Sequence, residues 1–170
     1  MVVVAIVAVS GLSVFILAPG ARTLRLEAFE FGFDGHFGGP TLRVKVGETL
    51  RITLVNRGGI EHEFMVVRDV NEFLEQIQLK VRELQAKGLK EEQIKTSEEI
   101  EEIHENFVAV KLMVGGKESM EVEVDRGETA QFEVTFRAPG TFYYVCAEFE
   151  ATFPSTHADR GMYGTIIVEA

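Results

Sequence analysis

Cysteine is almost absent from this sequence. The 170 residues contain a single cysteine, Cys146. An intrachain disulfide needs two thiols, and a four-thiolate zinc site or a cysteine-ligated iron–sulfur cluster needs several more. The chain therefore cannot form any of these on its own, and Cys146 acts without a second cysteine.

Positive charge is also scarce. Lys and Arg together number 17 against 27 Asp and Glu, which gives a formal net charge of −10. Binding to nucleic acids or to anionic lipid surfaces depends largely on Lys and Arg that neutralise phosphates. We therefore expect no nucleic-acid partner, and we expect protein partners that carry a basic docking surface.

Charged side chains are missing altogether from the first 18 residues. A segment of roughly 17 to 25 apolar residues is long enough to cross a bilayer. A secretory signal would have a Lys or Arg before this segment, and none is present. We therefore expect residues 1–20 to be an uncleaved membrane anchor. Arg22 and Arg25 follow it and favour a cytoplasmic domain by the positive-inside rule. The alternatives are a signal-like targeting segment and a buried N-terminal strand or helix.

Short strands dominate the remainder, residues 22–170, which we expect to form one domain. Residues 42–54 and 120–136 each contain two stretches of alternating apolar residues around a Gly-Glu-Thr turn, and each predicts a hairpin-like pair. Residues 23–33 also alternate, with a change of phase between Ala28 and Phe29 that predicts a strand with a bulge. The pattern indicates an all-β, antiparallel sandwich or barrel.

A helical insertion is predicted at about residues 69–106. Asp69 and Glu72 form a capping pattern, apolar residues then recur every three or four positions, and Gly88 ends the first helix. A second helix is expected to start at Thr96. The insertion carries ten acidic and five basic residues between positions 71 and 106. We interpret it as a solvated flap over the sandwich, with a dedicated docking element as the alternative.

Three potential metal ligands lie close together near the C-terminus: Cys146, His157 and Met162. A thiolate, an imidazole and a thioether suit copper, because Cu(I) prefers sulfur and Cu(II) accepts imidazole. A trigonal site of this kind needs a second histidine. His62 is the best candidate, because it follows a Gly-rich loop and begins an apolar strand.

The other two histidines are poorer candidates for this site. His36 lies in a glycine-rich loop and His104 lies on the charged helix. A nucleophilic Cys-His pair is a further alternative for Cys146, but the sequence offers no orienting third group or oxyanion motif.

The C-terminal motif resembles that of the cupredoxins, the type 1 or blue copper proteins. The sequence GTFYYVC leads to Cys146, Met162 follows His157 after four intervening residues, and the chain continues with GTIIVEA. The resemblance extends from about Leu24 to Ala170. It implies a Greek-key β-sandwich that binds one Cu(I)/Cu(II) ion through His62, Cys146, His157 and Met162.

The same resemblance implies a function and a location. Cupredoxins of this type are one-electron carriers in electron-transfer chains and not enzymes. Together with the N-terminal segment, the resemblance predicts a membrane-tethered carrier on the extracytoplasmic face, in conflict with the charge bias of Arg22 and Arg25.

The loop between Cys146 and His157 departs from the family pattern, because it contains ten residues where two to four are usual. The run CAEFE also resembles the copper loop of cytochrome oxidase subunit II, but Glu150 and Pro154 stand where its second cysteine and its histidine would be. A dinuclear centre is therefore not expected. A red copper site remains open, in which Glu148 or Glu150 binds the metal and an enzymatic role follows; a copper carrier or chaperone is the other alternative.

Overall fold

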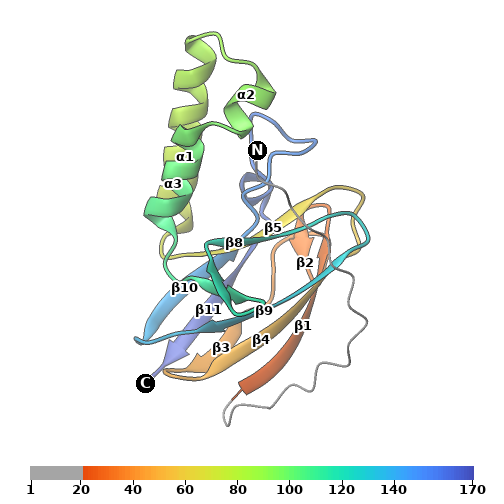
Figure 1. The fold of residues 1–170 in the computed structure, drawn as a ribbon, viewed down its shortest axis with the longest axis vertical. Helices are drawn as coiled ribbons and strands as arrows, with labels where there is room; N and C mark the ends of the chain where they lie inside the picture. The colour runs from red at the N-terminus through yellow and green to blue at the C-terminus, as the bar shows by residue number, and fades with distance from the viewer. Residues whose placement is uncertain (1–20) are drawn as a thin grey trace.

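The computed structural model describes residues 21–170 as a sandwich of two β-sheets with helices at one end (Figure 1). The first sheet has the strand order β2 (Gly32–Phe33), β1 (Ala21–Phe29), β4 (Thr49–Asn56), β9 (Thr129–Thr135), β6 (Leu112–Val114) and β7 (Lys117–Ser119). The second has the order β3 (Leu42–Lys45), β11 (Tyr163–Glu169), β10 (Gly140–Val145), β5 (His62–Val67) and β8 (Glu121–Val124). The four edge strands, β2, β7, β3 and β8, have four residues or fewer.

The predicted membrane anchor, residues 1–20, lies outside the described residues. From Ala21 onward, no helix combines the length and the apolar character needed to cross a bilayer. The mostly β class is confirmed, but the sheets are not purely antiparallel: β1 pairs in parallel with β4, and β3 pairs in parallel with β11.

The two Gly-Glu-Thr segments do not form hairpins, contrary to the sequence-based prediction. The strands on either side of each turn belong to different sheets: β3 and β8 to the second, β4 and β9 to the first. Each segment thus carries the chain from one sheet to the other, with Gly47 (φ 81°) and Gly127 (φ 77°) in the left-handed region. Both arrangements require the same alternation of apolar residues, so the pattern alone cannot distinguish them.

The predicted bulge at Ala28 is also wrong. Strand β1 ends at Phe29, and β2 returns antiparallel to it, with Ala28 opposite Phe33. The change of phase therefore marks a reversal of the chain.

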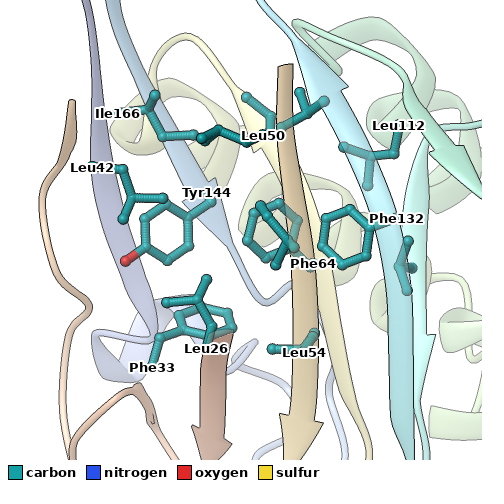
Figure 2. Close-up of a cluster of buried hydrophobic side chains, with 14 of the residues drawn as sticks. Leu26, Phe33, Leu42, Leu50, Leu54, Phe64, Leu112, Phe132, Tyr144 and Ile166 are labelled. Carbon is teal, nitrogen blue, oxygen red and sulfur yellow. The ribbon is translucent and has the colours of Figure 1, made fainter. Parts of the chain in front are cut away.

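A hydrophobic core that contains an aromatic cluster lies between the sheets (Figure 2). The rings of Phe64 and Tyr144 stack at a centroid distance of 5.3 Å, and Phe132 packs against Phe64 at 4.9 Å. The hydroxyl of Tyr144 donates a hydrogen bond to the carbonyl of Pro40 at 2.7 Å, so its polar end is satisfied. Burial of a side chain of this size stabilises the fold by roughly 1.5–3 kcal/mol.

The predicted insertion is helical, with three helices: α1 (Val70–Ala86), α2 (Glu91–Lys95) and α3 (Glu98–Phe107). The side chain of Asp69 accepts hydrogen bonds from the amides of Asn71 and Glu72, which confirms the predicted cap. Helix α2 was not predicted. Helix α3 is capped by Ser97 rather than by Thr96, because the Ser97 hydroxyl reaches the amide of Ile100.

These helices build a second core against the outer face of the second sheet. Met65 and Val67 of β5 are fully buried there together with Phe73, Ile77 and Ile100. All six residues of β5 are buried, because the aromatic cluster covers one face of the strand and the helices cover the other. The insertion is thus an integral part of the packing.

Substitution of Gly164 by alanine is expected to destabilise the sandwich. Gly164 lies opposite Tyr144, and a Cβ atom there would sit 2.2 Å from atoms of the Tyr144 ring. We expect a loss of about 1–3 kcal/mol in the free energy of unfolding, measured by urea denaturation. Gly35→Ala is the matched control, because its nearest neighbour would lie 4.0 Å away. Equal stability of the two variants would contradict this account.

Candidate metal centre

Neighbouring strands bring the predicted ligands together at one end of the sandwich. His62 begins β5, Cys146 directly follows β10, and these two strands are paired. One ligand atom each from His62, Cys146 and His157 lies within 4.8 Å of the others. All three residues and Met162 are fully buried, and Met162 belongs to the same core cluster as Cys146.

Both imidazoles present the same nitrogen to the thiol. The Sγ of Cys146 lies 3.3 Å from Nδ1 of His157 and 3.8 Å from Nδ1 of His62. Nε2 of His157 lies 2.8 Å from the carbonyl oxygen of Glu150, which can only accept a hydrogen bond. The proton of His157 is therefore on Nε2, and the lone pair of Nδ1 faces the thiol, as a metal ligand requires.

The ring of His62 is closely packed against the Gly-rich loop. A Cβ atom on Gly58 would lie 2.9 Å from Nε2 of His62, so the absence of a side chain at position 58 makes room for the ring. Within residues 21–170, this buried Nε2 has no hydrogen-bond partner. The Gly-rich loop noted in the sequence thus shapes the pocket of the His62 ring.

A backbone amide stabilises the sulfur. The N–H group of Glu63 donates a hydrogen bond to Sγ of Cys146 at 3.2 Å. A donor at this position favours the thiolate over the thiol, because it interacts more strongly with the charged form.

The loop that carries the other two ligands is tied back to Cys146. The amide of Cys146 donates to the carbonyl of Met162 at 3.1 Å, and the amide of Ala158 donates to the carbonyl of Cys146 at 2.9 Å. The amide of Met162 donates in turn to the carbonyl of His157 at 3.1 Å, across the short turn η1 (Ala158–Arg160). These bonds hold the segment from His157 to Met162 against Cys146.

Burial sets the protonation of the donors. Removal from water lowers the pKa of His62 to about 4, with a further lowering from His157, and burial also lowers the pKa of His157. Burial raises the pKa of the Cys146 thiol. Both imidazoles are therefore neutral at pH 7, and a bound cation would displace the thiol proton.

Neither carboxylate of the ten-residue loop joins the donors. Oε1 of Glu148 accepts hydrogen bonds from the amides of Phe149 (2.7 Å) and Glu150 (2.9 Å). The carboxylate of Glu150 accepts from the amide of Glu61. Both side chains are thus used to hold the backbone of the loop and its neighbour.

The ten-residue loop rests on the helical insertion. The side-chain amide of Gln78, in α1, donates to the carbonyl of Pro154 at 3.0 Å and to Oδ2 of Asp159 at 2.9 Å. Phe149 and Ala158 pack into the core beneath the helices. The helices therefore position the segment that supplies His157.

The structure leaves the two poorer candidates away from these donors. His36 lies in an exposed loop with its ring 6.0 Å from that of Phe29, and Nδ1 of His104 lies 3.1 Å from Oε2 of Glu121. Sequence reasoning missed the Glu63 amide and the Glu150 carbonyl, because a main-chain group carries no sequence signal. It also missed Phe31, whose ring packs edge-on against His157 at 5.7 Å.

The donor set fits a type 1 copper site. Two imidazole nitrogens and one thiol sulfur lie close together, and Met162, whose carbonyl accepts a hydrogen bond from the amide of Cys146, is buried in the same core. Such a trigonal arrangement with a weak axial sulfur can accommodate both oxidation states of copper.

Comparison with known proteins shows the fold. No protein-family model and no curated sequence matches the chain. Among solved structures, it is similar to auracyanin A of Chloroflexus aurantiacus, a "blue" copper protein. The TM-score is 0.53 and the identity is 19%, over 88% of this chain and all of that one. It is similar to auracyanin of Roseiflexus castenholzii at a TM-score of 0.52 and 16% identity, over 87% and 97%.

The chain is also similar to part of an enzyme. A laccase of Pediococcus acidilactici aligns at a TM-score of 0.55 and 15% identity, over 91% of this chain but 28% of the laccase. The chain therefore has a cupredoxin-like fold.

Proposed function

We propose that the protein is a mononuclear type 1 copper protein that acts as a one-electron carrier. Its ligands are His62, Cys146, His157 and Met162. The observation that carries this proposal is the convergence of two neutral imidazoles on one buried thiol, in a pocket that backbone hydrogen bonds hold in shape.

The burial of the donors favours electron transfer over catalysis. A catalytic metal keeps an open position for substrate, whereas all four donors here come from the protein and are fully buried. The carboxylates that a red copper site would need are engaged with backbone amides. The resemblance in fold to auracyanins, which align over nearly their whole length, supports the same assignment.

Phe31 marks a route for the electron. His157 is fully buried, and the half-buried Phe31 ring packs against it in an edge-on contact. We propose that a partner that contacts this ring exchanges electrons with the copper through Phe31 and His157.

We further propose that the chain is tethered to a membrane by its uncharged N-terminal segment, on the extracytoplasmic side, and that its redox partners are basic proteins. The uncharged first 18 residues support the tether, and the net charge of −10 supports basic partners. The extracytoplasmic side rests on the resemblance to cupredoxins alone.

Cys146→Ala is expected to abolish the intense thiolate-to-copper absorption band of the Cu(II)-loaded chain. The band requires the sulfur ligand, which alanine lacks. His36→Ala and His104→Ala should retain the band, because neither ring lies with the donors. A colourless His104 variant, measured by visible absorption, would show that the ligand assignment is wrong.

Met162→Gln is expected to keep the colour and lower the reduction potential. The thioether is a weak, soft ligand that favours Cu(I), whereas an amide oxygen is harder and favours Cu(II). Glu148→Gln and Glu150→Gln should change the potential little, because both side chains bind backbone amides. Voltammetry of the three variants checks this, and a shift confined to a glutamate variant would identify a carboxylate ligand instead.

Electron exchange with a basic partner is expected to slow as salt rises. The screening length is about 8 Å at physiological ionic strength and shortens as salt is added. Attraction between charges that lie farther apart than this length is therefore weak. Replacement of Glu98, Glu99, Glu101 and Glu102 on α3 by glutamine should reduce this salt dependence. Stopped-flow rates at several ionic strengths measure it, and rates independent of salt in both forms would exclude a docking role for α3.

A further inference from the structure

A second group of metal-ligating side chains lies on the other side of β5 from the copper ligands. Glu63 comes from β5, Glu121 from β8 and His104 from α3. One ligand atom from each lies within 4.8 Å of the other two. Nδ1 of His104 lies 3.1 Å from Oε2 of Glu121. The three elements thus meet at one point beneath the helical insertion.

The alternation of side chains along the strands separates the two groups. In β5, His62 and Phe64 face the interior of the sandwich, whereas Glu63 and Met65 face the helices. In β8, Val122 belongs to the interior core and Glu121 lies on the opposite face. Helix α3 then places His104 over these carboxylates.

Two of these side chains are buried with unsatisfied polar atoms. Glu63 is 7% exposed and His104 is 8% exposed. Across the described part of the chain, Oε2 of Glu63 and Nε2 of His104 are buried without a hydrogen-bond partner. Burial of a polar group without a hydrogen-bond partner costs free energy, and a bound cation offsets that cost.

The negative charge around the cluster also favours a bound cation. Glu63 lies directly opposite Glu123 in the paired strands, an arrangement of like charges that destabilises a sheet. A pocket of about 450 Å³ opens onto the cluster, and seven glutamates and one lysine line it.

We propose that Glu63, His104 and Glu121 bind one divalent cation of the zinc class. One imidazole and two carboxylates are borderline and hard donors that suit Zn²⁺, and the pocket leaves a position for water. The set contains no sulfur, so it differs in metal preference from the site of Cys146.

Glu63 couples the two sites. Its side chain is a ligand of the second site, and its backbone N–H donates to Sγ of Cys146 at 3.2 Å. A cation bound at Glu63 adds positive charge close to the sulfur and disfavours Cu(II) relative to Cu(I). Zinc at the second site therefore raises the reduction potential of the copper, a consequence that rests on the proposed copper function.

Titration of the copper-loaded full chain with Zn²⁺ by calorimetry tests the site. We expect one Zn²⁺ per wild-type chain, and binding weakened by roughly tenfold or more in Glu121→Gln and in His104→Gln. His36→Gln is the matched control and should bind as the wild type does, because His36 lies in an exposed loop. Absence of binding to the wild type, or equal binding to Glu121→Gln, overturns the proposal.

Thermal unfolding gives a second measurement, and the transition of each variant without zinc shows that the variant folds. Zinc should raise the Tm of the wild type and of His36→Gln, because a ligand that binds the native state stabilises it. Zinc should raise the Tm of Glu121→Gln much less, because this variant binds zinc more weakly. A rise of the same size in Glu121→Gln places the zinc elsewhere and overturns the assignment.

The Cys146→Ala background separates this inference from the proposed function. One Zn²⁺ that binds to Cys146→Ala and is lost when Glu121→Gln is added supports the second site, whether or not the wild type forms a thiolate–copper band. Absence of that band from the wild type counts against the copper function alone. In the coloured wild type, voltammetry should show a higher potential with zinc, and no change in potential overturns the coupling.

Discussion

The burial of β5 on both faces is the constraint on which the arrangement of this protein depends. One face of the strand contributes His62, Phe64 and Val66 to the interior of the sandwich, and the other face contributes Met65 and Val67 to the core beneath the helices. A sheet face that carries such side chains needs a cover, and the three helices of the insertion provide it. The strand therefore fixes the metal centre and the place of the insertion together, because adjacent residues of β5 point to opposite sides.

The insertion and the ten-residue loop are two parts of one structure. Helix α1 holds the loop through Gln78, and Phe149 and Ala158 of the loop region complete the core beneath the helices. A loop of this length between two ligands would cost more conformational entropy to order than a short one. Packing against the helices offsets part of that cost and holds the segment that supplies His157.

Much of the fold and the donors of the first site could be predicted from sequence, for reasons that differ by residue. Cys146, His157 and Met162 lie within one short stretch and combine unusual donor types, and His62 follows a Gly-rich loop, so the structure brings together residues that local pattern singled out. The two Gly-Glu-Thr turns were misjudged, because a hairpin and a crossing between sheets share one alternation pattern. Glu63, His104 and Glu121 are far apart in the sequence, and glutamates are too common for the sequence to single these out. The one unusual feature is the carboxylate of Glu63 within the apolar run of β5.

The short edge strands bear on how the protein behaves at high concentration. Unpaired N–H and C=O groups on a long, flat edge act as a template for strand addition and lead to aggregation. Here β2 has two residues and β7 has three, and β3 exposes Arg43 and Lys45 on its four residues. A neighbouring molecule therefore finds little edge on which to extend either described sheet, and accumulated copies can crowd together without joining through their backbones.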